Sequence, residues 1–212
     1  MRIDPDQVLW SVPEAQRAGR PLMVMLHGHG SNEQVGFDFR HYLPPELVVA
    51  SIRAPLRAGG GYAWFPLDAS LALSQIDEVS HAVLDWLDDQ PAAPSLGILG
   101  FSQGAATGVQ TMRLAPERFD YAVVLSGFVI PLPAAGDAVL RTRRPAAFYG
   151  RGDQDGIIPS FLLPQTSAWL AEHTTLTERT YRGLGHYVSS AELTELGQFL
   201  RDQLDRSRPQ AT

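Results

Sequence analysis

Short apolar runs recur along this 212-residue chain, and segments with a helical pattern separate them. The runs occupy residues 22–26, 47–52, 96–101, 121–125, 146–149 and 176–181. Several are apolar at nearly every position, which is typical of strands that are covered on both faces. Strands that alternate with helices form a mostly parallel sheet with helices on both faces. We therefore expect an α/β fold in a single domain over residues 1–212, in which residues 207–212 form a loose tail.

Helical periodicity is clear near residues 76–88 and again near the end of the chain. In the first segment Ile76, Val79 and Val83 fall on one helical face, and acidic residues occupy the opposite side. In the second, Ser189 and Glu192 have the spacing of a capping box, and leucines follow at positions 193, 196, 200 and 204. We expect amphipathic helices at both places, and another helix over residues 105–114.

The composition excludes several kinds of chemistry. The sequence has no Cys, so a thiolate nucleophile, a Cys-ligated zinc and an iron–sulfur cluster are excluded. All 17 basic residues are Arg, and without Lys the chain has neither a Schiff-base lysine nor the lysine of a nucleotide-binding P-loop. With 23 acidic residues the net charge is -6, which argues against a nucleic-acid partner.

We expect a cytoplasmic protein without a membrane span. The N-terminal residues include Asp4 and Asp6 and lack the apolar stretch of a secretory signal peptide. No apolar run approaches the ~20 residues that a transmembrane helix needs. The sequence leaves open whether the chain acts alone or as a homodimer.

Gly100, Ser102 and Gly104 form a Gly-x-Ser-x-Gly pattern directly after an apolar strand and directly before a helical run. In this context a sharp turn from strand to helix holds the serine in a strained backbone conformation and exposes its hydroxyl, and the glycines avoid collisions with neighbouring elements. The N-terminal amides of the helix also favour negative charge near the serine. We therefore predict Ser102 as a nucleophile. The alternative is a glycine-rich turn in which the serine caps the helix.

A serine hydroxyl needs a general base, and an acid that orients the base, before it can attack an acyl carbon. His186 lies in a short glycine-containing loop after the last predicted strand, so we predict it as the base; the alternative is an exposed loop histidine. Asp155 stands immediately before apolar residues that can bury it, so we predict it as the acid. Its neighbour Asp153 is expected to cap the turn through its own backbone. The order Ser102, Asp155, His186 is that of α/β-hydrolases.

Acyl transfer also needs donors for the negatively charged oxygen of the tetrahedral intermediate. We predict the backbone N–H of Gln103, the residue after the nucleophile, and that of His29, in the glycine-rich loop after the first apolar strand. A second interpretation takes His27 and His29 as a metal pair, but no third metal-binding residue type lies beside them in the sequence. We therefore expect no metal and no cofactor.

These motifs resemble those of a known family, the small α/β-hydrolases of the phospholipase/carboxylesterase group, which includes the acyl-protein thioesterases. The resemblance covers most of the chain and rests on residues 26–33, 54–55, 64–65, 100–105, 152–159 and 185–186. It implies hydrolysis of carboxylic esters without a cofactor. It also implies a catalytic triad of Ser102, Asp155 and His186, and an oxyanion site at His29 and Gln103.

Two segments bear on substrate binding. Tyr62, Trp64 and Phe65 lie on a loop between a strand and a helix, where they could wall an acyl pocket. The alternative is that Trp64 and Phe65 merely cover the core. Residues 128–140 contain several Pro and Gly residues, and they could form a small lid or a plain surface crossover.

The function that we predict is that of a serine hydrolase. It would cleave carboxylic esters, or thioesters, of small to medium acyl groups through an acyl-enzyme on Ser102, and its partner would be a small-molecule ester. Two alternatives stay open: an acyltransferase or perhydrolase that uses the same acyl-enzyme, and a non-catalytic module that binds a ligand on the same fold.

Overall fold

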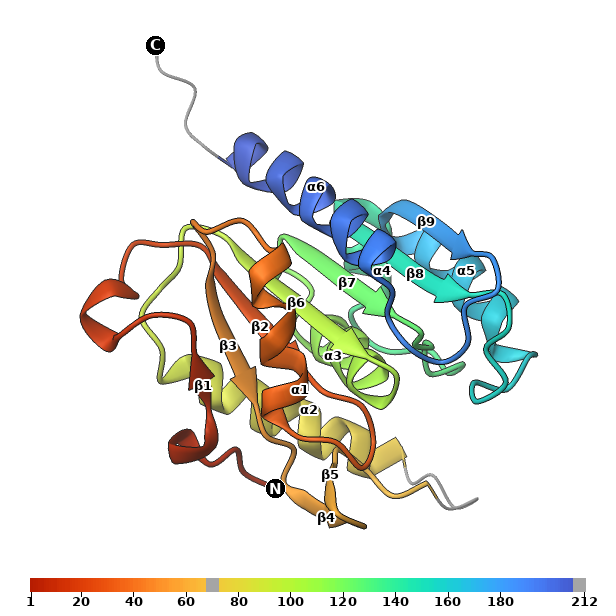
Figure 1. The fold of residues 1–212 in the computed structure, drawn as a ribbon, viewed down its shortest axis with the longest axis horizontal. Coiled ribbons are helices and arrows are strands. Elements are labelled where there is room, and N and C mark those ends of the chain that lie inside the picture. The colour runs from red at the N-terminus through yellow and green to blue at the C-terminus, as the bar shows by residue number, and fades with distance from the viewer. Residues whose placement is uncertain (68–72, 208–212) are drawn as a thin grey trace.

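The computed structural model describes residues 1–67 and 73–207, and a seven-stranded sheet lies at its centre (Figure 1). The strand order is β1-β3-β2-β6-β7-β8-β9; β1 pairs antiparallel with β3, and all other neighbours are parallel. The bounds are β1 Leu9–Trp10, β2 Leu22–Leu26, β3 Val48–Ile52, β6 Leu96–Phe101, β7 Tyr121–Leu125, β8 Ala146–Gly152 and β9 Thr175–Tyr181. The mostly parallel sheet confirms the predicted α/β fold.

The strands predicted from apolar runs are all present, with shifts at their ends. The largest shift is in β8, which continues to Gly152 because its last residues pair with the polar edge strand β9. The sequence analysis missed β1 and also a separate antiparallel hairpin of β4 (Leu56–Ala58) and β5 (Gly61–Ala63). Strands of two or three residues are too short to show an apolar period.

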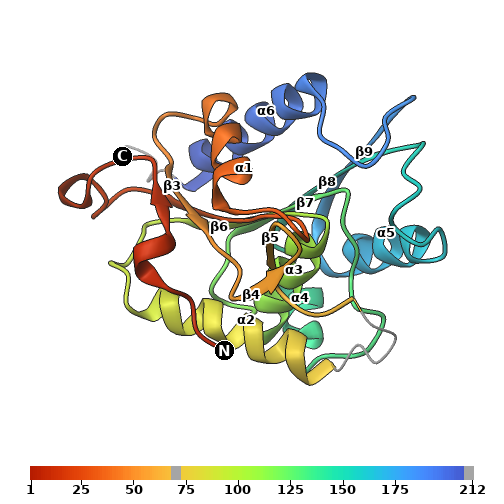
Figure 2. The same cartoon turned by 60° about the horizontal axis from the view of Figure 1, so that its bottom comes forward.

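Helices cover both faces of the sheet, as Figure 2 shows. Helices α1 and α6 lie on one face, and α2, α3, α4 and α5 lie on the other. The bounds are α1 Glu33–Phe37, α2 Leu73–Asp88, α3 Gln103–Leu114, α4 Asp137–Arg143, α5 Leu162–His173 and α6 Ser190–Ser207; short 3-10 helices occupy Pro5–Gln7, Glu14–Gln16 and Asp38–Tyr42. Within the described residues, no helix has the length and apolar character that crossing a membrane requires.

Helix α6 closes the fold in the predicted way. Ser189 Oγ accepts a hydrogen bond from the N–H of Glu192 at 3.1 Å, and Glu192 Oε2 accepts one from the N–H of Ser189 at 3.4 Å. This reciprocal pair is the predicted capping box. The leucines that follow it are buried against the sheet: Leu193, Leu196, Leu200 and Leu204. Of the predicted tail, residues 208–212 lie outside the described residues.

The parallel arrangement determines where functional side chains meet. Because β2, β6, β8 and β9 run in the same direction, their carboxyl ends lie at one edge of the sheet. The loops that leave this edge carry His29, Ser102, Asp155 and His186. Residues separated by up to 84 positions in the sequence therefore come into contact there.

Candidate active site

Ser102 occupies the sharp turn between β6 and α3. Its φ of 54° and ψ of -119° place it in a strained region that residues other than Gly rarely adopt. The glycines on either side are required, because a Cβ on Gly100 would collide with Ala105, and a Cβ on Gly104 would collide with the carbonyl of Leu26. The Ser102 side chain makes no capping hydrogen bond to α3. The alternative of a helix-capping serine therefore does not describe this turn.

A hydrogen-bond chain joins Ser102, His186 and Asp155. His186 Nε2 lies 2.9 Å from Ser102 Oγ, and His186 Nδ1 lies 2.8 Å from Asp155 Oδ2. The carboxylate can only accept from Nδ1–H, which leaves Nε2 free to accept the hydroxyl proton of Ser102. The side chain of Asp155 is 1% exposed, whereas that of His186 is 16% exposed. The arrangement has a buried acid, an oriented imidazole and a serine within reach of it.

Backbone contacts hold the acid loop and the histidine loop together. Asp155 Oδ1 accepts hydrogen bonds from the N–H groups of Ile157 at 2.9 Å and Ile158 at 3.2 Å, which fixes its carboxylate. Asp153 Oδ1 accepts from the N–H of Gly183 at 2.7 Å. The prediction that Asp153 caps its own turn is therefore wrong, because its partner lies on the loop that carries His186. That partner is thirty residues away in sequence, and no local pattern indicates it.

The two residues whose N–H groups are predicted to receive the oxyanion line the same cavity as Ser102. His29 and Gln103 both line the cavity that contains Ser102, and neither backbone N–H has a protein acceptor within the described part of the chain. Gln103 also has a structural role that the sequence analysis missed. Its side-chain oxygen accepts from the N–H of Trp64 at 2.9 Å, and its side-chain nitrogen donates to the carbonyl of Phe65 at 2.6 Å. This side chain joins the start of α3 to the chain that follows β5.

His27 has a structural environment, not that of a metal ligand. One ring nitrogen lies 2.8 Å from the carbonyl of Gly28, and the other accepts from the N–H of Ala54 at 3.1 Å. Burial lowers the pKa of His27, which favours the neutral ring that these two bonds require. No group of three or more metal-binding side chains occurs among residues 1–67 and 73–207.

A cavity of about 640 Å³ opens beside Ser102 and His186. Apolar side chains make up most of its wall. They come from β2, from α1 and the 3-10 helix that follows it, from the chain after β5, from β6, from the loops after β7, β8 and β9, and from the start of α5. No Asp, Glu or Arg lines it in the described part of the chain. The cavity is therefore suited to an uncharged, apolar group.

The three aromatic residues predicted to wall this pocket do not line it. Trp64 and Phe65 are buried in the core, and the indole N–H of Trp64 donates to the carbonyl of His27 at 2.7 Å. Tyr62 instead contacts two guanidinium groups, those of Arg53 and Arg57, each 4.6 Å from the centre of its ring. The alternative that Trp64 and Phe65 cover the core describes the structure.

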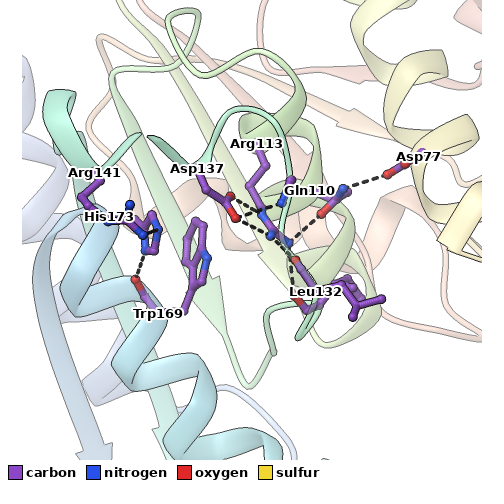
Figure 3. Close-up of polar contacts among 10 residues, drawn as sticks. Asp77, Gln110, Arg113, Leu132, Asp137, Arg141, Trp169 and His173 are labelled. Atoms are coloured by element: carbon purple, nitrogen blue, oxygen red, sulfur yellow. Dashed lines mark hydrogen bonds and ion pairs between the residues drawn. The ribbon is translucent and has the colours of Figure 1, made fainter. Parts of the chain in front are cut away.

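Residues 128–140 contribute Phe128 to the cavity wall, but the segment is firmly anchored (Figure 3). Arg113 of α3 is 1% exposed, and it donates to the carbonyls of Ile130, at 3.1 Å, and Leu132. Its Nε and one terminal nitrogen each lie 2.8 Å from the carboxylate of Asp137. Although burial acts to raise the pKa of Asp137, these bonds hold it below its ordinary value. The anchoring is that of a fixed crossover, not of a lid.

The same network reaches α5. Figure 3 shows the indole of Trp169 between Arg113 and the imidazole of His173. The guanidinium carbon of Arg113 lies 5.1 Å from the centre of the indole, and the ring of His173 stacks on it at 4.2 Å with an angle of 8°. Helix α3, which begins directly after Ser102, is thereby held against α4 and α5.

Comparisons with known proteins identify the family of the chain. A family model described as phospholipase/carboxylesterase matches residues 9–204. Acyl-protein thioesterase 1 of Kluyveromyces lactis is 27% identical to this chain over 219 residues, which cover 91% of this chain and 96% of that protein. The crystal structure of acyl-protein thioesterase 2 of Zea mays has a TM-score of 0.75 at 24% identity and covers 93% of this chain and 98% of that one.

A second solved structure is similar at the level of the fold. The carboxylesterase of Bacillus cereus has a TM-score of 0.77 at 16% identity and covers 92% of this chain and 93% of that one. The family model spans almost the whole chain, including the strand ends that carry the site. This chain therefore belongs to the phospholipase/carboxylesterase family of α/β-hydrolases and is a carboxylesterase-type hydrolase.

Proposed function

We propose that this chain hydrolyses carboxylic esters through an acyl-enzyme on Ser102. The observation that supports the proposal best is the continuous hydrogen-bond chain from Asp155 through His186 to Ser102, with distances of 2.8 and 2.9 Å. A nucleophile within reach of a base, and a base oriented by a buried acid, is the arrangement that serine catalysis requires. The apolar cavity beside it supports an uncharged ester as the substrate.

In the first half-reaction Ser102 Oγ attacks the acyl carbon, and its proton passes to His186 Nε2. A bond forms between Oγ and the acyl carbon, and the carbonyl oxygen takes the negative charge. The N–H groups of His29 and Gln103 donate to this oxygen. The bond between the acyl carbon and the leaving oxygen then breaks, His186 gives that oxygen the proton, and an alcohol departs. Asp155 remains ionised throughout and stabilises the charged imidazole.

In the second half-reaction water takes the place of the alcohol. His186 Nε2 accepts a proton from the water as its oxygen attacks the acyl carbon, and the oxyanion forms at the same two N–H groups. The bond from the acyl carbon to Ser102 Oγ breaks, and His186 returns the proton to Oγ. A carboxylic acid leaves, and the free enzyme is restored.

The same steps can release a thiol from a thioester, since only the leaving atom differs. The similarity to a protein named acyl-protein thioesterase 1 supports thioesters as a second class of substrate. The uncharged lining of the cavity supports acyl groups that carry no ionised substituent.

Covalent labelling with a fluorophosphonate and hydrolysis of p-nitrophenyl acetate test this proposal. Ser102→Ala should abolish the label and lower kcat by ~10⁶-fold, the scale of loss seen when such a nucleophile is removed. Ser126→Ala is a matched control. Ser126 also directly follows a strand and has a positive φ, of 42°, but its hydroxyl has no partner in the described part of the chain.

The control variant should keep the label and the turnover. Persistent labelling of the Ser102→Ala variant, or hydrolysis within tenfold of the wild type, would show that another residue is the nucleophile. Wild-type protein that neither reacts with the fluorophosphonate nor hydrolyses the ester would support a non-catalytic binding module instead.

A further inference from the structure

The β4–β5 hairpin lies against the loop that carries His29. Tyr62 of β5 forms an isolated antiparallel bridge with Ser31, and its N–H donates to the carbonyl of Ser31 at 2.8 Å. The carbonyl of Tyr62 accepts from the N–H of Gly30, also at 2.8 Å. A Cβ on Gly61 would collide with the carbonyls of Gly30 and Ser31, so the two backbones are in close contact. The hairpin is therefore fixed beside the loop that is predicted to bind the oxyanion.

A row of three side chains leads from the cavity to the outer strand of the hairpin. Ser31 lines the cavity, Tyr62 pairs with Ser31, and Arg57 of β4 pairs in register with Tyr62. Residues that pair directly across antiparallel strands point to the same face. The guanidinium carbon of Arg57 lies 4.6 Å from the centre of the Tyr62 ring, and this contact restricts the orientation of a long side chain. The row therefore holds a guanidinium group on the side of the cavity where Ser31 lies.

The charge of Arg57 is not balanced by a carboxylate in the described part of the chain. Arg57 is exposed, and apart from its contact with Tyr62 it makes no hydrogen bond or ion pair there. Arg53, the other cation on the Tyr62 ring, differs in this respect. Its guanidinium donates to both carboxylate oxygens of Glu33, and the charge of Asp4 also acts on it. An exposed guanidinium without a carboxylate partner is suited to bind an anion from solution.

The position of Arg57 indicates which half of an ester it would meet. The wall of the cavity, as far as the structure describes it, contains no Asp, Glu or Arg and suits an uncharged acyl group. Arg57 lies outside this wall and faces solvent. In hydrolysis through an acyl-enzyme the acyl group stays on the serine, whereas the alcohol leaves for solvent and water replaces it. An anion beside Arg57 would therefore belong to the alcohol half.

On the basis of the proposed function, we infer that Arg57 binds an anionic group, a carboxylate or a phosphate, on the alcohol half of the ester. The planar guanidinium can donate two parallel hydrogen bonds to either group, and the hydroxyl of Ser31 in the same row can donate another. Because this anion lies away from the reacting carbon, it is bound equally well in the substrate complex and in the transition state. Its binding therefore lowers KM and leaves kcat unchanged. Arg57 is thus a specificity-determining residue.

The test compares butyrate esters of three phenols that differ in charge but share a two-carbon spacer. The phenols are p-hydroxyphenylpropanoate, p-hydroxyphenethyl phosphate and the neutral p-hydroxyphenylpropanamide. The readout is kcat/KM for each anionic ester relative to the amide within each variant, which removes any general loss of activity. The wild type should favour at least one anionic ester about fivefold through a lower KM, at the upper end of what exposed ion pairs contribute. The more strongly favoured ester identifies the anion.

Substitutions at Arg57 should change this preference according to charge. Arg57→Gln should remove it, Arg57→Glu should reverse it, and Arg57→Lys should retain part of it. Added salt should weaken it in the wild type, because salt screens exposed charges. Arg206→Gln is the matched control, since it removes the same charge from an exposed position in the last turn of α6. The control should keep the wild-type preference.

Three results would overturn the inference: no preference for either anionic ester in the wild type, an undiminished preference in Arg57→Gln, or an equal loss in Arg206→Gln. Each leaves the proposed function standing as long as the fluorophosphonate labels Ser102 and the neutral ester is hydrolysed. Wild-type protein that shows neither labelling nor hydrolysis would overturn the two together.

Discussion

Replacing Glu192 by Gln should make the stability of this protein less dependent on pH. The side chain of Glu192 is fully buried beneath Gly150 of β8, where a Cβ on the glycine would collide with its carboxyl oxygen. One of its oxygens accepts from the N–H of Ser189, and the other has no partner in the described part of the chain. Burial raises the pKa of Glu192 from its ordinary value of 4.5 to about 7.

The sign of the effect follows from which state holds the proton. Between pH 4.5 and about 7 the unfolded chain releases the proton of Glu192 while the folded protein keeps it, so a rise in pH favours unfolding. The stabilisation is complete below pH 4.5 and is lost as the pH passes through about 7. At about 1.4 kcal/mol per pKa unit, the loss amounts to ~3 kcal/mol of unfolding free energy. Gln cannot ionise, and it preserves the capping box.

Urea unfolding of both proteins at about pH 5 and about pH 8 measures this difference. The wild type should lose ~3 kcal/mol more than Glu192→Gln between the two pH values. Asp202→Asn is the control, because that side chain lies on the same helix, is exposed, and is not among the charges that raise the pKa of Glu192. Its pH dependence should match that of the wild type. Equal pH dependence in the wild type and Glu192→Gln would refute the reasoning.

Two further substitutions test the buried network and the triad. Arg113→Met should lower the unfolding free energy by ~3–5 kcal/mol in urea titrations, because the largely buried carboxylate of Asp137 loses its partner. Arg118→Met breaks a more exposed pair and should cost less than ~1 kcal/mol; equal losses would contradict the role of burial. Asp155→Asn should lower kcat for p-nitrophenyl acetate ~10⁴-fold, since the histidine loses the acceptor that sets its tautomer. Asp153→Asn, which keeps an acceptor for Gly183, should lower kcat far less, and similar losses would exclude Asp155 as the orienting acid.

The parts of the fold that could be predicted are those whose pattern lies within a short segment of the sequence. Fully apolar runs identified the central strands, because a strand that is buried on both faces of a sheet needs apolar residues at nearly every position. The capping box and the leucine stripe identified α6, because a helix that is buried on one face needs apolar residues at helical spacing. The turn that carries Ser102 was predictable for a similar reason. Its glycines and serine are adjacent in sequence, and their spacing follows from the backbone collisions at Gly100 and Gly104.

The cavity was not predictable in the same way, because its wall combines residues from many loops. Trp64 and Phe65 are large and aromatic, but they belong to the core, and their hydrogen bonds are made with His27 and Gln103, which are far away in sequence. Several of the apolar residues that do line the cavity, such as Phe128, lie in segments without a period. Tertiary contacts alone determine which apolar side chains face a cavity and which face the core.

The distances in the site depend on close approach of backbones at two glycines. A Cβ on Gly104 would collide with the carbonyls of Leu26 and His27, and a Cβ on Gly152 would collide with the carbonyl of Leu184. The first contact places the turn of Ser102 against the loop that carries His29, and the second places the loop of Asp155 against the loop that carries His186. Any side chain at either glycine must separate the two loops it joins. Because hydrogen bonds weaken steeply beyond their normal length, such a separation would disrupt the proposed proton transfer and oxyanion binding before it unfolded the sheet.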